Sequence, residues 1–225
     1  MRIHLIRHGD PDYANDTLTP LGHQQAKCLA DALDQTSIDA LFASPMGRAQ
    51  ATALYTSKGK GMPVETLEWL HELNGNYEGQ LWSWNMHGTE TLSRPTALSV
   101  DEWHLEIVYG PHMQRVVAPF YNSFDAFLAG YGYEREGFRY RIRRTAPETL
   151  TLFCHAGVVL TLLAHVLHIP LPVSYSQFGC DPSSVTTIDM EEAGGHGVFR
   201  LTGLNDMSHC ATLRHAVQQE GAFPG

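Results

Sequence analysis

The stretch Arg2-Ile3-His4-Leu5-Ile6-Arg7-His8-Gly9 decides the fold of this 225-residue chain. It is short, largely apolar and β-branched, which predicts a buried strand ending at His8. A second stretch has the same form, because Leu150-Thr151-Leu152-Phe153-Cys154 runs into His155-Ala156-Gly157. Ligands of open α/β sheets bind at the carboxyl ends of the strands. Two strands that each end in a histidine beside a small residue therefore predict a ligand site at that edge.

The same alternation of strand, turn and helix continues outward from these two stretches. Thr19 as N-cap, followed by Pro20 at the first helical position, predicts a helix start, and Ser44 is expected to cap another helix. The predicted helices cover 20–33, 46–55 and 158–167, and further strands are expected at 38–43 and 64–67. This alternation is typical of an α/β fold, namely a three-layer α/β/α sandwich with a mostly parallel central sheet.

A single domain over 1–225 is expected, with an inserted helical cap at about 80–149. This region does not follow the alternation, and a capping box, Ser99-Val100-Asp101-Glu102, predicts a helix start there. A second helical pattern spans about 112–128. Near the end of the chain, apolar segments at 185–188 and 198–201 flank Gly194-Gly195, which favours a hairpin or an addition at a sheet edge.

Composition excludes several classes of function. A formal net charge of −9 argues against a nucleic-acid surface, which needs many phosphate-neutralising cations. No apolar stretch approaches the ~18 residues of a membrane span. The four cysteines are widely spaced, so reduced thiols are expected instead of a disulfide framework or a zinc site. Because the chain passes at once into a core strand, no signal sequence is expected and the cytoplasm is the default location.

Several positive groups are expected to converge on one anion. Arg48 follows a predicted strand and falls in the first turn of a helix, where free N–H groups and the helix dipole attract anions. Arg7 and Arg48 each offer a planar fork to phosphate oxygens. With His8 and His155 beside them, these residues predict a phosphate site that needs no metal and no other cofactor.

Six short motifs follow one another along the chain. They are Arg7-His8-Gly9, Leu18-Thr19-x-x-Gly22-x-x-Gln25-Ala26, Ser44-Pro45-x-x-Arg48-Ala49-x-x-Thr52-Ala53, Leu70-x-Glu72, Tyr77-Glu78-Gly79 and His155-x-Gly157. In this order and spacing they resemble the histidine phosphatase superfamily, also called the phosphoglycerate mutase-like family. Arg-His-Gly alone would be a weak signal, and a lone histidine there would usually be a core residue.

The resemblance implies a role for each matching residue. His8 would be the nucleophile that carries the phosphoryl group, and Arg7, Arg48 and His155 would hold the phosphoryl oxygens. Glu72 would be the proton donor to the leaving oxygen, and His155 would also count as catalytic. The alternatives for the acid are Glu65, Glu68 and Glu78, and a surface salt bridge is the ordinary reading of Glu72.

The resulting hypothesis is a metal-independent phosphatase acting on a small phosphorylated molecule through phosphohistidine. A mutase, which returns the phosphoryl group to another hydroxyl, uses the same chemistry. A catalytically silent phosphate-binding module and a metallohydrolase built on the thirteen histidines are rivals from other classes. His165 and His168 stand three apart on a predicted helix, but no nearby carboxylate or cysteine completes a metal site there.

Two further groups of residues have open readings. Alternation in the run 135–144 places Phe138, Tyr140 and Ile142 on one face of a strand and its arginines on the other, which is typical of a solvated face. The sharper alternative is that these arginines bind an anionic part of the substrate or the partner subunit of a homodimer. Asn205, Asp206 and His209 either line the site or cap a turn near the end of the chain.

Overall fold

The computed structural model describes residues 1–77, 81–85, 87–93, 96, 99–105, 110–146, 148–211 and 213. Glu78, one of the alternative acids, and the Glu78-Gly79 part of its motif lie outside these residues.

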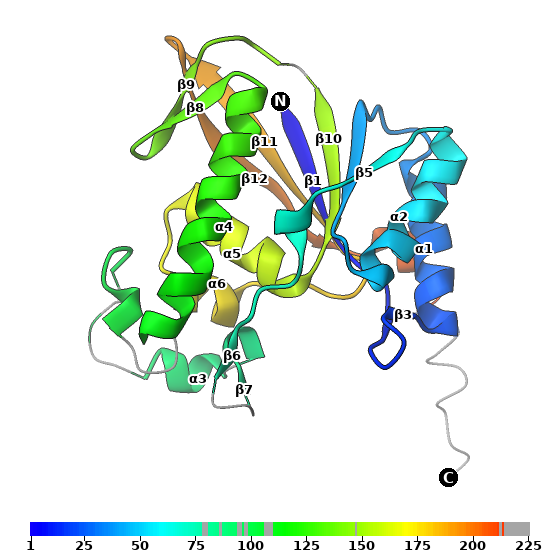
Figure 1. Ribbon diagram of the computed structural model, residues 1–225, viewed down its shortest axis with the longest axis horizontal. Helices are drawn as coiled ribbons and strands as arrows, with labels where there is room; N and C mark the ends of the chain where they lie inside the picture. The colour runs from blue at the N-terminus through cyan, green and yellow to red at the C-terminus, as the bar shows by residue number, and fades with distance from the viewer. Residues whose placement is uncertain are drawn as a thin grey trace.

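The centre of the molecule is one large twisted sheet (Figure 1). Its eight strands within the described residues are, in spatial order, β5 (Val64–Thr66), β4 (Ala40–Ala43), β10 (Thr149–Cys154), β1 (Arg2–Arg7), β11 (Val185–Ala193), β12 (His196–Asp206), β9 (Arg139–Ile142) and β8 (Tyr133–Glu136). Only β11 and β9 run against the direction of β1, so six of the eight strands point the same way. The mostly parallel sheet expected from the sequence is confirmed.

Helices cover both faces of this sheet, which makes the three layers. Figure 1 shows α1 and α2 on one side and α4, α5 and α6 on the other. The described helices are α1 (Pro20–Leu33), α2 (Gly47–Lys60), α3 (Gly88–Thr91), α4 (Gly110–Gly130), α5 (Ala156–Leu167) and α6 (Leu171–Gln177), with short 3-10 turns η1 (Glu68–Leu70), η2 (Ser83–Asn85), η3 (Trp103–Leu105) and η4 (Ser208–Cys210). Two small ribbons, β2 (Pro11–Asp12) with β3 (Thr17–Leu18) and β6 (Asn76–Tyr77) with β7 (Leu81–Trp82), lie outside the main sheet.

Alternation along β1 divides its side chains between two cores. Ile3 and Leu5 pack in the core shared with α4 and α5, whereas Ile6 packs in the core beneath α1 and α2. All three side chains are fully buried. A strand buried on both faces and paired on both edges is fixed in place, and β1 pairs in parallel with β10 and antiparallel with β11. The residue that follows β1 therefore has a well-defined position.

The two predicted helix starts have different outcomes. Thr19 caps α1 as predicted, since its Oγ1 accepts a hydrogen bond from the Gly22 N–H. Ser44 does not cap α2, because Met46 occupies the N-cap position and makes no side-chain capping bond. The Asp16 carboxylate accepts the Gly47 N–H instead, at 2.7 Å. A carboxylate at a helix N-terminus is favourable, and here it comes from a distant loop that local sequence does not reveal.

The segment expected to be a helical cap is mixed in structure. The predicted helix at 112–128 is present as α4, but Phe120, Phe124 and Leu128 pack in the main core. Residues 133–142 form β8 and β9, which extend the main sheet. Ser99 accepts hydrogen bonds from the N–H groups of Asp101 and Glu102, yet only the short turn η3 follows within the described residues.

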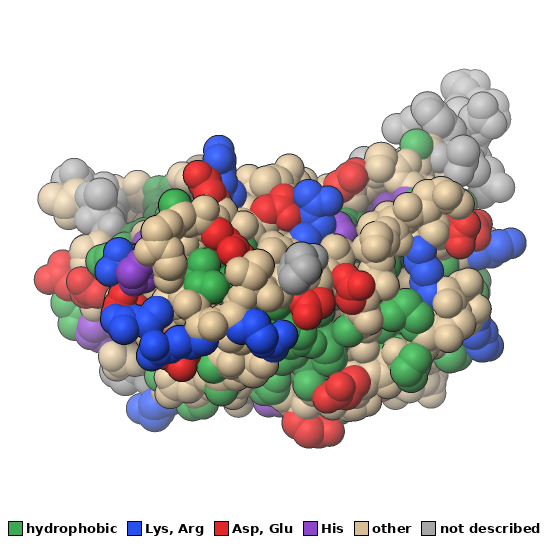
Figure 2. All heavy atoms as spheres, turned by 90° about the horizontal axis from the view of Figure 1, so that it is seen from above, with side chains coloured by type: hydrophobic (Ala, Val, Ile, Leu, Met, Phe, Trp, Pro, Cys, Tyr) green, Lys and Arg blue, Asp and Glu red, His purple; other side chains and the backbone are tan. Residues whose placement is uncertain are grey.

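The hairpin β8–β9 carries the basic run. Basic side chains gather on the left of the face seen in Figure 2, with acidic ones among them. Arg139 and Arg141 both pair with Glu136, and Arg143 pairs with Glu134. The expectation of a solvated face therefore holds for these arginines. The prediction that Phe138 shares a strand face with Tyr140 and Ile142 is wrong. Phe138 is 66% exposed and lies in the turn beside Gly137, where a φ of 61° interrupts the extended backbone.

Two expectations concern thiols and membranes. Cys28, Cys154, Cys180 and Cys210 are free thiols, as predicted. Within the described part of the chain, no helix is both long enough and apolar enough to cross a bilayer.

Candidate active site

The two histidines that end β1 and β10 lie side by side. The register pairs Arg7 with Cys154, so His8 and His155 leave the sheet at adjacent points. Their ring centroids are 5.1 Å apart at an interplanar angle of 62°. Both side chains are buried, at 2% and 0% exposure. The expected convergence of two imidazoles at one edge of the sheet is therefore present.

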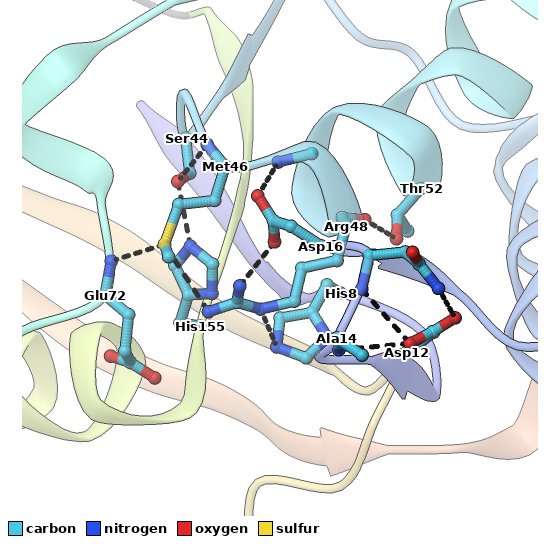
Figure 3. Close-up of polar contacts among 12 residues, drawn as sticks. His8, Asp12, Ala14, Asp16, Ser44, Met46, Arg48, Thr52, Glu72 and His155 are labelled. Carbon is cyan, nitrogen blue, oxygen red and sulfur yellow. Dashed lines mark hydrogen bonds and ion pairs between the residues drawn. The ribbon is translucent and has the colours of Figure 1, made fainter.

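His8 is held in one tautomer by its neighbours. Its Nδ1 lies 2.7 Å from the Gly9 carbonyl oxygen, which can only accept, so Nδ1 carries the proton. Its Nε2 then carries the lone pair and accepts the Arg48 Nε–H at 3.2 Å (Figure 3). Burial, aided by the charges of Arg7 and Arg48, lowers the pKa of His8 to about 4 despite the bond to Gly9. The imidazole is thus neutral at physiological pH, and its Nε2 lone pair accepts the hydrogen bond from Arg48.

His155 is held by Ser44, the residue that the sequence predicted as the cap of a helix. Its Nε2 and the Ser44 Oγ form a hydrogen bond of 2.8 Å. Burial lowers the pKa of His155 to about 2, and a proton on His8 and the charge of Arg48 would each lower it further. Its buried Nδ1 has no hydrogen-bond partner among the described residues. Such an unsatisfied group is costly unless a ligand satisfies it.

Arg48 is the most constrained cation of the site. Its Nε donates to His8, one terminal nitrogen donates to Asp16 Oδ1 at 2.6 Å, and the other lies 3.4 Å from the Met46 sulfur (Figure 3). The side chain is nearly buried, because only 6% of the residue is exposed. Asp16 adopts a left-handed backbone conformation with φ of 46°. Asp16 was not anticipated, since no feature of its local sequence marks a partner 32 residues away.

Arg7 is held by the segment before β11. One of its terminal nitrogens donates to the Cys180 carbonyl oxygen at 2.5 Å, while its buried Nε has no partner among the described residues. The Ser183 N–H in turn donates to the carbonyl oxygens of Arg7 and His8. These bonds fix the position of Arg7 while leaving part of its guanidinium free to bind an anion.

The residues Asn205 and His209 support that same segment and do not line the site. Asn205 accepts the Asp181 N–H at 2.6 Å and donates to the Asp181 carboxylate at 3.1 Å. His209 Nε2 is hydrogen bonded to Ser183 Oγ at 2.8 Å. Asp206 accepts the Ser208 N–H, which caps a turn. None of the three is among the residues that line the cavity, and only Asp206 bonds within a turn as the second reading expected, whereas Asn205 and His209 bond to the segment before β11.

Glu72 lies beside the end of β10, as its motif led us to expect. Its Oε1 accepts the Leu73 N–H at 3.0 Å and its Oε2 accepts the Gly157 N–H at 3.4 Å. Burial raises the pKa of Glu72 from 4.5 to about 7, and the two hydrogen bonds and nearby guanidinium groups only partly oppose this rise. A carboxyl group with such a pKa can both give and take a proton near neutrality.

The raised pKa of Glu72 predicts a pH-dependent cost in stability. The folded state binds this proton more tightly than the unfolded state does, so the free energy of unfolding falls as pH rises from about 4.5 to about 7. Glu72→Gln removes the titration, and we expect it to stabilise the protein by about 1–3 kcal/mol at pH 8 but hardly at pH 4. Urea denaturation of both proteins across this range measures the difference. A difference that stays constant with pH would contradict the assignment.

These side chains border one cavity of about 690 Å³. Its lining residues are Arg7, His8, Tyr13, Met46, Arg48, Glu72, Leu73, Asn74, Trp82, Trp84, Asn85 and Ala156. His155 stands next to His8 without being among them. The alternative acids Glu65 and Glu68 are not part of the lining either. Of the residues that the sequence did not single out, Tyr13, Trp82 and Trp84 carry no local signal, because aromatic side chains are as common in cores as in pockets.

The arrangement suits a tetrahedral anion. Two guanidinium groups supply planar donors, and the neutral His8, whose Nε2 accepts the Arg48 Nε–H, lines the same cavity. Within the described residues, no three His, Cys, Asp or Glu side chains form a cluster that could hold a metal ion. His165 and His168, which stand three apart on α5 and its C-terminal end, bond to different partners. His165 is hydrogen bonded to the Asp125 carboxylate, and His168 is hydrogen bonded to the Phe138 carbonyl oxygen.

Two curated relatives match most of the chain, and a third matches about a third of it. Adenosylcobalamin/alpha-ribazole phosphatase of Salmonella typhimurium is 29% identical over 180 residues, which cover 76% of this chain and 81% of that protein. Phosphoserine phosphatase 1 of Hydrogenobacter thermophilus is 26% identical over 203 residues, covering 85% and 88%. Another relative from H. thermophilus is 36% identical over 93 residues, but these span only 46% of its length.

Solved structures share the fold. Mycobacterial glucosyl-3-phosphoglycerate phosphatase in complex with VO3 superposes with a TM-score of 0.62 at 20% identity, covering 91% of this chain and 98% of the other. The alpha-ribazole phosphatase from Shigella flexneri gives a TM-score of 0.60 at 23% identity, covering 92% and 97%. The family model of the histidine phosphatase superfamily, branch 1, matches residues 3–206. With both the fold and the motifs in agreement over nearly its whole length, the chain belongs to the histidine phosphatase superfamily.

Proposed function

We propose that the protein is a metal-independent phosphatase that hydrolyses phosphate monoesters through a covalent phosphohistidine at His8. One observation carries this proposal: His8 is neutral, with Nδ1 bound to the Gly9 carbonyl and the Nε2 lone pair directed at the guanidinium of Arg48. A neutral imidazole nitrogen is a competent nucleophile toward phosphorus. The family and its phosphatase relatives support an enzyme of this kind.

In the first step His8 Nε2 attacks the phosphorus of the bound ester. The N–P bond forms as the bond between phosphorus and the leaving oxygen breaks, and Glu72 gives its proton to that oxygen. Arg7, Arg48 and His155 stabilise the charge on the three equatorial oxygens. The pKa of about 7 at Glu72 supports this role, since a useful fraction of the carboxyl group is protonated at neutral pH.

In the second step water replaces the histidine. The ionised Glu72 takes a proton from water while the water oxygen bonds to phosphorus and the N–P bond breaks. Inorganic phosphate leaves, and both Glu72 and His8 return to their starting protonation states. A mutase would transfer the same phosphoryl group to a substrate hydroxyl, so the fate of the phosphoryl group separates the two reactions.

The proposal is tested by trapping the intermediate. Mixing the protein with p-nitrophenyl phosphate in excess chelator, followed by an alkaline quench that preserves phosphohistidine, is expected to add one phosphoryl group to the peptide containing His8. Mass spectrometry of the digest locates it, and release of inorganic phosphate shows hydrolysis. Turnover without any label on His8, or turnover that chelator abolishes, would refute the mechanism.

A further inference from the structure

The cavity beside His8 has far more room than a phosphoryl group needs. Its volume of about 690 Å³ lies in the range of sites that enclose drug-sized ligands. The cations of its described lining, Arg7 and Arg48, both stand at the end occupied by His8 and Glu72. The rest of the described lining is uncharged: Tyr13, Met46, Leu73, Asn74, Trp82, Trp84, Asn85 and Ala156.

Trp84 forms a rigid wall of this outer part. A Cβ atom on Gly75 would lie 2.2 Å from its ring, and one on Gly157 would lie 2.9 Å from it, so the indole fits only because both positions are glycine. Tyr175 packs edge-on against the same ring, with centroids 6.1 Å apart. A ring held this closely cannot turn away when a ligand arrives, and rigid walls reduce the entropy lost on binding.

Trp82 extends this wall toward solvent. Its ring stacks on Trp84 with centroids 5.2 Å apart and an interplanar angle of 26°, yet 41% of Trp82 is exposed. Large apolar side chains left exposed at the edge of a cavity favour ligand contact. The stacked pair therefore presents an aromatic surface to whatever is attached to the bound phosphate.

A third ring reaches the cavity from another part of the fold. Tyr13 follows β2 in the loop that leads to β3, next to α2, whereas Trp82 and Trp84 belong to β7 and η2, next to α6 (Figure 1). Tyr13 lies over the Arg48 guanidinium, 5.4 Å from its ring centroid, and is 67% exposed. Aromatic side chains thus border the cavity from two segments, one next to α2 and one next to α6.

Building on the function proposed above, we infer that the leaving alcohol carries an uncharged planar ring system, as in a nucleoside 5′-monophosphate, which stacks on Trp82. Asn74 and Asn85 place amide groups in the same lining, and amides can pair with the polar edges of such a ring. A monoester with a carboxylate next to the phosphate, such as phosphoserine, finds no further cation in the described lining. Stacking on aromatic side chains accepts any base, because every base has a π-face.

The test compares two substrates with the same leaving oxygen. Adenosine 5′-monophosphate and ribose 5-phosphate are both esters of a primary alcohol, and they differ in the base. We expect kcat/KM for the nucleotide to be larger by about 10- to 100-fold, the gain typical of stacking one ring. O-phosphoserine is expected to react no better than ribose 5-phosphate.

Variants locate the source of that preference. Trp82→Ala is expected to bring the ratio of the two kcat/KM values close to one, and Trp82→Phe to keep most of it. Phe138→Ala removes another exposed aromatic side chain, from the β8–β9 turn, and should leave the ratio unchanged because Phe138 does not line the cavity.

The outcomes distinguish this inference from the proposed function. If His8 is labelled and p-nitrophenyl phosphate is hydrolysed, but the nucleotide is no better than ribose 5-phosphate, the ring preference is overturned and the phosphatase proposal stands. A preference that survives Trp82→Ala would equally overturn the inference. If no ester is hydrolysed and no label appears, both proposals fail together.

Discussion

Replacing His8 by alanine is expected to abolish turnover of every phosphate monoester, with a loss of at least about 10⁴-fold in kcat. The proposed reaction passes through a bond to His8 Nε2, and among the described residues no second histidine lines the cavity to replace it. His155 stands closest, but burial and its bond to Ser44 fix it in place. The measurement is the rate of phosphate release at saturating substrate.

The control for this loss is a histidine of the same fold outside the site. His23 lies on α1 and is exposed, and its side chain bonds only to Tyr55 among the described residues. His23→Ala should keep turnover close to that of the wild type. Vanadate should still raise the Tm of the His8→Ala protein, which would show that Arg7 and Arg48 still bind an oxyanion. Retained turnover in this variant would remove the central claim.

Replacing Glu72 by glutamine is expected to separate substrates by the basicity of their leaving group. An alkoxide needs a proton as it departs, whereas p-nitrophenolate does not, so kcat/KM should fall by about 10²–10⁴-fold for alkyl phosphates and far less for p-nitrophenyl phosphate. Since kcat/KM reports only the steps up to the phosphorylated enzyme, slower hydrolysis of that intermediate does not enter the comparison. Equal losses on both substrates would identify another group as the acid.

The pH dependence gives the same residue a second signature. With alkyl phosphates, kcat/KM of the wild type should decline above about pH 7, as Glu72 loses its proton, and below about pH 4, as His8 gains one. Glu72→Gln should lack the upper limb. Glu68→Gln, an exposed neighbour on η1 that was an alternative acid in the sequence, should keep both limbs.

The parts of the fold that could be predicted are those whose signal is local. β1 shows as an apolar run that ends at a histidine, and α1 as Thr19 followed by Pro20. The hairpin β11–β12 shows as two apolar segments around the pair Gly194-Gly195. The arginines and histidines of the site could be found because each stands at the end of a strand, directly after one, or in the first turn of a helix. Their convergence follows from the parallel arrangement of the strands.

The parts that could not be predicted depend on contacts between distant segments. Ser44 stands where the sequence predicts a helix cap, but its hydroxyl is hydrogen bonded to the buried imidazole of His155, 111 residues away. Asp16 belongs to a polar loop, and only the folded chain brings it to Arg48. Residues 133–142 were assigned to a helical cap because alternation along a strand does not tell which sheet the strand joins.

The central position of β1 also bears on how members of such a family can diverge. His8, the proposed nucleophile, directly follows a strand with a neighbour on each edge and a core on each face, where nearly any displacement would disrupt many contacts at once. By contrast, Tyr13 lies in the loop of the small ribbon β2–β3 and Trp82 lies in the ribbon β6–β7, and in the described chain neither ribbon pairs with any further strand. If these rings bind the alcohol as inferred above, mutation can exchange them while His8 and its neighbours stay in place.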